Sequence, residues 1–360
     1  MGDEASQRLE TAAIVIVEAI CAFEGALRRL HPASIGALRE GLLLRAGGLA
    51  SVTKTLSAEA AGARSDEARC MADAAGLLMD AISLFGNGDD PARAFLAALQ
   101  SVRPFCRAHE LLFPLASSIP TLRSLFEEGA AACTPGAPRG GRPGPEDLLV
   151  HKTSLGDDPY GRGGYSLFVP SSGRGRPVPL VVAMHGGSGH GRDFLWTWLR
   201  EARSRGFILM APTSSGRTWS LDDIARDAER VAGHIDEVCS KHQVDRTRVL
   251  LTGVSDGGTF ALGLGLGDWL SAPDIAPVAC VLPRVDLKAA RSRRILWVHG
   301  ALDWMFPVGT AARACEELSR AGCDVRLRII QDLAHAYPRE ENDAILGWFD
   351  HSLRSPCAET

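Results

Sequence analysis

One serine in this sequence stands in a setting that is typical of a nucleophile. The apolar run 249–252 stops at Gly253-Val254-Ser255-Asp256-Gly257, and a segment of small residues that suits the start of a helix follows. Glycine two places before and two places after Ser255 removes the Cβ atoms that would collide in a tight strand-to-helix turn. Such a turn would hold the hydroxyl of Ser255 at the carboxyl edge of a sheet and at the N-terminal end of a helix.

Two further side chains follow apolar runs and have the types that activate a serine. His335 follows the last of these runs and is the natural general base, because an imidazole can take the hydroxyl proton and return it later. Asp303 follows the run 295–298, where a carboxylate can accept a ring N–H and fix the tautomer of the histidine. Asp286 and Asp332 remain lesser candidates for the acid.

A glycine-rich loop follows the apolar run 178–184 and suits the binding of a negatively charged oxygen. It begins His185-Gly186-Gly187, and glycines allow backbone N–H groups to approach an oxygen closely. We expect Gly186 and Gly187 to form one side of an oxyanion hole, with the N–H of Asp256 as the second donor. A phosphate-binding loop is a poorer interpretation, because the spacing differs from that of a P-loop and no lysine follows.

Tryptophans near the expected carboxyl edge of the sheet are candidates for a substrate pocket. Trp219 and Trp304 are preferred, because Trp304 directly follows the expected acid and Trp219 lies in the loop after the run 206–210. Ordinary core packing explains each of them equally well. Arg192 and Arg217 could meet an anionic substrate, although a solvated role suits them better.

A stretch dense in proline and glycine divides the chain into two parts. Proline and glycine at the density of residues 134–147 do not continue a helix or a central strand. We therefore predict an all-helical domain at 1–133, a linker at 134–147 and a second domain at 148–360.

Before the linker, apolar residues recur every three to four positions, which predicts helices. The expected helical runs are 9–30, 33–57, 58–84, 91–113 and 120–132. Ser65-Asp66 and Asp90-Pro91 are typical helix starts. His31 and His109 are isolated in this domain, and we interpret them as surface or capping residues.

After the linker, short apolar runs rich in valine, isoleucine and leucine replace the helical pattern. They are residues 164–169, 178–184, 206–210, 249–253, 278–282, 295–299 and 325–330. Longer amphipathic segments such as 221–242 separate them. Apolar strands that alternate with helices predict an α/β fold with a doubly wound, mostly parallel sheet that helices cover on both faces. Ligands of such sheets bind at the carboxyl ends of the strands.

Composition and charge exclude several other classes of protein. Of the 360 residues 46% are hydrophobic, which supports a large core, and a net charge of −4 gives no sign of nucleic-acid binding. No segment reaches the roughly 20 apolar residues of a transmembrane helix. The nine cysteines form no C-x-x-C pair, so we expect reduced, packed thiols in a cytoplasmic protein and no metal site.

The motifs together resemble those of the α/β-hydrolase superfamily of serine esterases. The residues that carry the resemblance are His185-Gly186-Gly187, Gly253-Val254-Ser255-Asp256-Gly257, His299-Gly300-Ala301-Leu302-Asp303 and His335-Ala336-Tyr337-Pro338. Residues 148–353 are similar to compact esterases grouped with phospholipase/carboxylesterases and with polyhydroxybutyrate-depolymerase-like or feruloyl esterases. The chain order serine, aspartate, histidine is also that of this fold. One difference is Ala334, where many relatives have glycine.

The resemblance implies hydrolysis of a small carboxylic ester through an acyl-Ser255 intermediate, without a cofactor. A peptidase or an acyltransferase on the same fold is an alternative, because amides can form the same acyl-enzyme and other nucleophiles can resolve it. A non-catalytic binding protein, whose helical domain is the working part, is a second alternative.

The segment before the expected acid is too short to hold a lid domain. Only residues 283–294 separate the two relevant apolar runs. We therefore expect a site that is open or that the N-terminal helical domain covers. That domain is otherwise expected to mediate oligomerisation.

Overall fold

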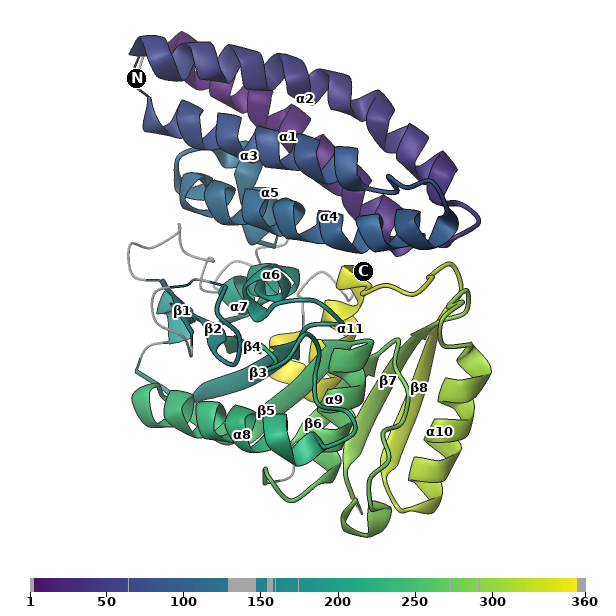
Figure 1. The fold of residues 1–360 in the computed structure, drawn as a ribbon. Coiled ribbons are helices and arrows are strands. Elements are labelled where there is room, and N and C mark those ends of the chain that lie inside the picture. The colour runs from purple at the N-terminus through teal and green to yellow at the C-terminus, as the bar shows by residue number, and fades with distance from the viewer. Residues whose placement is uncertain are drawn as a thin grey trace. The chain divides into compact units, whose positions relative to one another are not determined.

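Two compact units make up the chain, residues 1–128 and 129–360 (Figure 1). The computed structural model describes residues 3–63, 65–128, 147–153, 158, 160–173, 175–271, 273–290 and 292–354. The predicted domain boundary at residue 133 and residues 134–146 of the predicted linker lie outside the described residues.

The first unit is helical throughout its described elements. These are α1 (Asp3–Arg28), α2 (Ile35–Ala63), α3 (Asp66–Leu84), α4 (Pro91–Leu112) and α5 (Arg123–Phe126), with 3-10 turns at Phe113–Ser117 and Pro120–Leu122. Two predicted starts are confirmed: Ser65 caps α3 by accepting the N–H of Ala68, and Asp90 caps α4 ahead of Pro91. The predicted break at residues 57–58 is wrong, because α2 continues to Ala63 and the chain turns only at the Ser65 cap.

Aromatic rings fill part of the core of the helical unit. Phe23 stacks on Phe105 with 4.6 Å between ring centroids, and Phe85 meets Phe23 edge to face. The prediction that His109 is a surface or capping residue is wrong, since it is 2% exposed. Its Nδ1 donates to the carbonyl of Phe105 one turn earlier, which satisfies a buried polar atom inside the helix itself.

An eight-stranded sheet forms the framework of the second unit. Its strands are β1 (Leu148–Lys152), β2 (Tyr165–Val169), β3 (Val178–Met184), β4 (Ile208–Pro212), β5 (Val244–Val254), β6 (Asp274–Val278), β7 (Arg294–Gly300) and β8 (Asp324–Ile330). Their order is β1-β2-β4-β3-β5-β6-β7-β8. Strand β2 is antiparallel to β1 and β4, and all the other pairs are parallel.

Helices cover both faces of this sheet (Figure 1). One face carries α8 (Ile224–Lys241), α9 (Asp256–Leu266) and α10 (Val308–Arg320), which share a core with Leu251 and Trp297 of the sheet. The other face carries α7 (Leu199–Arg205) and α11 (Asn342–Phe349), joined where Nδ2 of Asn342 donates to Glu201. This is the predicted doubly wound α/β arrangement, and the strand order is that of the α/β-hydrolase fold.

The predicted strands hold except at one central position. The run 278–282 is not a strand, because β6 ends at Val278 and Ala279 takes a left-handed φ of 47° that turns the chain. The strand β6 itself lies just before this run, at Asp274–Val278. Its Pro277 is unusual in a central strand, so the sequence pattern does not predict a strand there. Among the described helices, none is both long and apolar enough to cross a bilayer.

Candidate active site

Ser255 occupies a strained turn between β5 and α9. Its backbone has φ 57° and ψ −123°, a left-handed conformation that a residue with a side chain seldom adopts. The backbone N–H of Ser255 donates to the carbonyl of Val278 at 3.0 Å, and its carbonyl accepts the N–H of Thr259. These two bonds attach the turn to the end of β6 and to the first turn of α9.

The glycines on both sides of Ser255 are sterically required, as the sequence predicts. A Cβ on Gly253 would lie 2.7 Å from the carbonyl oxygen of Met184, and one on Gly257 would lie 2.3 Å from the same oxygen. Both contacts are with backbone atoms of β3, which cannot move aside as a flexible side chain could. The tight packing of β3, β5 and α9 therefore sets the position of the Ser255 hydroxyl.

Ser255, His335 and Asp303 lie in one chain of hydrogen-bonding distances, although 80 residues separate the serine from the histidine. Nε2 of His335 is 3.1 Å from Oγ of Ser255, and Nδ1 is 2.9 Å from Oδ2 of Asp303. Because a carboxylate only accepts, Nδ1 carries the proton toward Asp303. In the neutral ring Nε2 is then free to accept the hydroxyl proton of Ser255.

Asp303 is held by its own loop and by a buried histidine. Its Oδ1 accepts the backbone N–H groups of Met305 at 3.0 Å and Phe306 at 2.8 Å, which leaves Oδ2 for His335. Nε2 of His299 lies 3.5 Å from Oδ2 and donates to the carbonyl of Phe306. Burial lowers the pKa of His299, so this ring is neutral beside the carboxylate.

The two lesser candidates for the acid have other positions. Asp286 is exposed and caps a short 3-10 turn through the N–H of Lys288. Asp332 is exposed. Asp303 is therefore the carboxylate that the structure brings to His335.

The loop predicted to bind an oxyanion lies directly against the serine turn. A Cβ on Gly186 would be 3.7 Å from the Cβ of Ser255, and one on Gly187 would be 2.8 Å from Oδ2 of Asp256. Asp256 is the first residue of α9, where a backbone N–H has no partner within the helix. The N–H of Ser255 is occupied by Val278, which leaves Asp256 as the donor on that side.

His185 is a buried, neutral ring that holds the start of this loop in place. Nδ1 donates to the carbonyl of Gly186 at 2.7 Å, and Nε2 accepts the backbone N–H of Ser214 at 3.1 Å. Burial is the main cause that lowers the pKa of His185 to about 3, and the positive charge of Arg162 adds to it. The two ring nitrogens thus hold one tautomer and join two loops.

Trp219 lies beneath that loop and not in a substrate pocket. The indole is 2% exposed, stacks between His185 and Phe260, and donates its Nε1–H to the carbonyl of His185 at 2.8 Å. The prediction that Trp219 binds substrate is wrong, because His185 and Phe260 cover both faces of the indole and a buried carbonyl accepts its N–H. Trp304 is half-buried beside Asp303.

Two charged side chains that the sequence analysis did not identify organise the neighbouring loop 213–220. Arg162 donates to the carbonyls of Gly189 and Gly216 and to Oγ of Ser214. Asp227 of α8 accepts the backbone N–H and hydroxyl groups of Ser215 and Ser220. Burial raises the pKa of Asp227, but these hydrogen bonds outweigh it and leave the pKa below its usual value. No periodicity or motif marks such long-range contacts.

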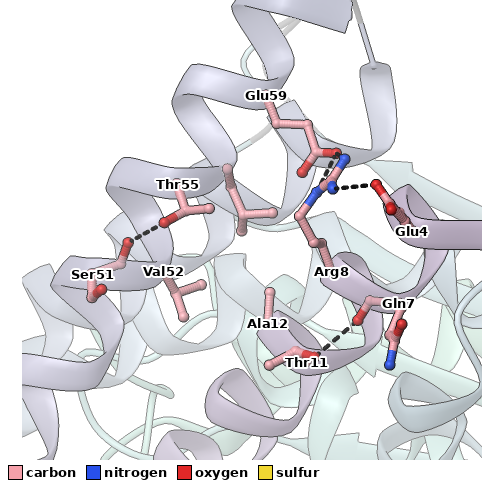
Figure 2. A pocket seen from close by; sticks show the side chains of 10 residues that line it. Glu4, Gln7, Arg8, Thr11, Ala12, Ser51, Val52, Thr55 and Glu59 are labelled. Atoms are coloured by element: carbon pink, nitrogen blue, oxygen red, sulfur yellow. Dashed lines mark hydrogen bonds and ion pairs between the residues drawn. The ribbon is translucent and has the colours of Figure 1, made fainter.

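Two pockets of the described surface lie apart from these side chains. One of about 460 Å³ is lined by α1 and α2, and Arg8 of α1 donates to Glu59 of α2 among its lining residues (Figure 2). The other, of about 630 Å³, is lined by the start of α8, the end of α9 and the segment 284–288. Neither is lined by Ser255 or His335. In the described part of the chain, no group of three or more His, Cys, Asp or Glu could hold a metal ion.

Comparisons with known proteins find similar folds among solved structures. The sequence matches no protein-family model and no curated protein. The structure of esterase PE8 is 21% identical, with a TM-score of 0.44, over 51% of this chain and 97% of that one. A thermophilic esterase from the Planctomycetes species Thermogutta terrifontis is 18% identical, with a TM-score of 0.44, over 60% of this chain and 96% of that one.

A plant structure gives a similar result. Acyl-protein thioesterase 2 of Zea mays is 16% identical, with a TM-score of 0.42, over 52% of this chain and 98% of that one. The strand order and the two helix layers of residues 148–354 are those of an α/β-hydrolase fold.

Proposed function

We propose that this protein hydrolyses carboxylic esters through an acyl-Ser255 intermediate. The observation that carries the proposal is the hydrogen-bonded chain from Oγ of Ser255 through His335 to Oδ2 of Asp303. A serine hydroxyl is a poor nucleophile at neutral pH unless a base removes its proton as it attacks. His335 is that base, and its hydrogen bond to Asp303 holds the ring in the tautomer that can accept the proton.

In the first half-reaction, Oγ of Ser255 attacks the ester carbonyl carbon while Nε2 of His335 takes the hydroxyl proton. The carbonyl π bond becomes a lone pair on oxygen, and a tetrahedral intermediate forms. The imidazolium is stabilised by the carboxylate of Asp303. The intermediate then expels the alkoxide, which receives the proton from Nε2 and leaves as an alcohol.

The negative oxygen of the intermediate is stabilised by backbone N–H groups. We assign the N–H of Asp256 and the loop of Gly186 and Gly187 to this task, because Asp256 directly follows Ser255 at the start of α9 and the loop packs against both residues. The N-terminal end of α9 adds a positive partial charge there. Each such donor is worth about 3 kcal/mol of transition-state stabilisation.

In the second half-reaction, water attacks the acyl-serine and His335 again serves as the base. A second tetrahedral intermediate collapses, the carboxylic acid leaves, and Ser255 regains its proton from His335. The alternatives of a peptidase or an acyltransferase differ in the bond that is broken or in the nucleophile that replaces water, so only substrates can separate them.

The loop that holds Asp303 also carries apolar residues, one of which contacts His335, and this supports an ester of an apolar alcohol. The leaving alcohol must lie next to His335 to receive its proton. Phe306 meets the His335 ring edge to face at 5.2 Å, and Leu302 and Met305 are 56% and 37% exposed in the same loop. Trp304 of this loop stays a proposed substrate-binding residue.

The role of the helical unit and the compartment are separate proposals. We propose that the helical unit covers the site or mediates oligomerisation, and that the protein works in the cytoplasm, where its thiols stay reduced. Among the described cysteines, Cys280, Cys315 and Cys323 are buried thiols that form no disulfide, which supports a reducing compartment. Deleting residues 1–140 tests the covering role: unchanged activity and acyl-chain preference would count against it.

A panel of p-nitrophenyl esters tests the proposed reaction. Wild type should hydrolyse at least the short-chain esters, and Ser255→Ala should lose activity by at least about 10⁴-fold. Ser240→Ala, which removes an exposed hydroxyl from α8, is the matched control and should keep full activity. Hydrolysis that survives Ser255→Ala would contradict the proposal, and so would a wild type that neither hydrolyses esters nor reacts with a fluorophosphonate.

A further inference from the structure

A single arginine connects both sides of the proposed oxyanion hole. Nη1 and Nη2 of Arg162 donate to the carbonyl of Gly189 at 3.2 and 3.1 Å, and Nη2 also donates to Oγ of Ser214 at 2.6 Å. Nε donates to the carbonyl of Gly216, and Nη2 lies 3.4 Å from the carbonyl of Arg217. The guanidinium thus joins two loops that lie 27 to 55 residues away in the sequence.

Each of these loops reaches the oxyanion hole in one further step. The N–H of Gly189 donates to the carbonyl of Gly186 at 3.0 Å, which closes the turn that presents Gly186 and Gly187. On the other side Oγ1 of Thr218, the residue after Arg217, donates to Oδ2 of Asp256 at 2.5 Å. The two proposed donors are therefore each linked to the same guanidinium.

The backbone that carries Arg162 is itself attached to one of the loops. The N–H of Gly163 donates to the carbonyl of Ser214 at 3.2 Å, and the N–H of Thr213 donates to the carbonyl of Gly164 at 2.8 Å. Nε2 of His234, on α8, donates to the carbonyl of Gly163 at 3.0 Å. The planar fork of an arginine, held in this way, presents its N–H groups in fixed directions.

Building on the proposed function, we propose that Arg162 is the positioning residue that sets the distance between the two donor sides of the oxyanion hole. These contacts join carbonyl and hydroxyl oxygens of both loops to one planar group. The field of Arg162 reaches this loop, since it helps burial to lower the pKa of His185.

Variants of Arg162 test this proposal through kcat, KM and the affinity for a transition-state analogue. A purely structural role of Arg162 would not change kcat and this affinity selectively. Arg162→Met should lower kcat by about 10²-fold and change KM little, because misplacing a donor by about 1 Å weakens the transition state more than the ground state. Affinity for a trifluoromethyl ketone, which becomes a tetrahedral oxyanion on Ser255, should fall by a similar factor. Arg162→Lys keeps the charge without the fork and should lose about tenfold in both quantities.

Arg248→Met is the matched control. Arg248 also donates to three acceptors, on Asp245, Asp350 and Pro177, but it precedes Ser255 by seven residues on β5, roughly 23 Å along the strand. This variant should lower stability, followed by tryptophan fluorescence during unfolding, and leave kcat and the ketone affinity unchanged.

Three results would overturn the inference. They are wild-type kcat and ketone affinity in both Arg162 variants, a change in KM alone, and equal losses of kcat in the Arg248 control. If Arg162→Met does not fold, the same criteria apply to Arg162→Lys, and wild-type behaviour of that variant overturns the inference. A wild type without esterase activity or fluorophosphonate labelling would instead remove the proposed function, which is a different result from an active wild type that is insensitive to Arg162.

Discussion

The two units of this chain satisfy their buried polar groups in different ways. Among the described residues, the helical unit buries two polar side chains, Ser101 and His109, and both bond to a carbonyl three or four residues earlier in the same helix. The second unit buries many more, including His185, Asp227 and Asp303, and each of these three has a partner in another element or loop besides any local one. A polar network that joins distant segments is expensive unless every member is satisfied, so its concentration in one unit indicates where specific geometry matters.

The largest predicted effect compares one carboxylate from each unit. Asp303→Asn should lower kcat by roughly 10³- to 10⁴-fold, because an amide cannot hold His335 in the accepting tautomer. Glu10→Gln changes a helical-unit carboxylate that accepts from the backbone and hydroxyl of Thr121. It should leave kcat within about twofold of wild type, because this carboxylate has no place in the proposed reaction. Steady-state kinetics of both variants decide whether carboxylates of the two units differ in role.

The next effect comes from the serine turn. Gly257→Ala places a methyl group against backbone oxygens of Met184 and His185, 2.3 and 2.4 Å away, and one strand or α9 must shift. We expect the free energy of unfolding to fall by about 1–3 kcal/mol, with loss of most activity. Chemical denaturation and ester hydrolysis measure both. Wild-type stability and activity in this variant would contradict the tight packing of the turn between β5 and α9.

The sequence alone predicts the parts of the site that depend on local patterns, and misses those that depend on contacts between distant loops. The residues around Ser255, and the positions of Asp303 and His335 after β7 and β8, follow from local patterns and chain order, because parallel strands bring their carboxyl ends to one edge. The contacts of Arg162, Asp227 and Trp219 do not follow. They depend on which loops meet after the sheet forms, and neither hydrophobic periodicity nor turn composition records that pairing. The sequence also predicts the strand β6 too late in the chain, because the apolar residues after Val278 belong to a turn that only the folded structure reveals.

A third effect concerns acid stability and separates the units by fluorescence. All seven tryptophans lie in residues 129–360, so their emission reports the second unit. The pKa of His185 is about 3 in the folded chain, below its usual 6.5, so the unfolded chain binds a proton that the folded chain does not. The contribution of His185 to the free energy of unfolding is therefore largest above pH 6.5. It falls between pH 6.5 and pH 3, by up to about 1.4 kcal/mol per pH unit.

His185→Gln isolates that contribution. As the pH falls below about 6.5, wild type should lose stability relative to this variant, because only wild type has His185. Above that pH the difference between their free energies of unfolding should be constant. Urea unfolding at several pH values, followed by tryptophan emission, measures it. A difference that does not vary with pH would show that His185 is not buried and neutral.

The smallest effect is expected in the helical unit. A Cβ on Gly76, within α3, meets nothing within 4 Å. Gly76→Ala should therefore stabilise the helical unit by about 0.5–1 kcal/mol, because alanine loses less backbone entropy in a helix. Far-ultraviolet circular dichroism during heating follows it, and ester hydrolysis should not change. A loss of activity here would break the separation of roles between the two units.

The central claim is an acyl group on Ser255, and mass spectrometry after a rapid quench tests it most directly. Protein mixed with p-nitrophenyl acetate and stopped in acid within the first turnovers should carry one acetyl group, on the peptide that contains Ser255. Ser255→Ala should carry none, and His335→Ala should acylate far more slowly. Ester hydrolysis without an acyl group on Ser255, or equal acylation of Ser255→Ala, would contradict the account.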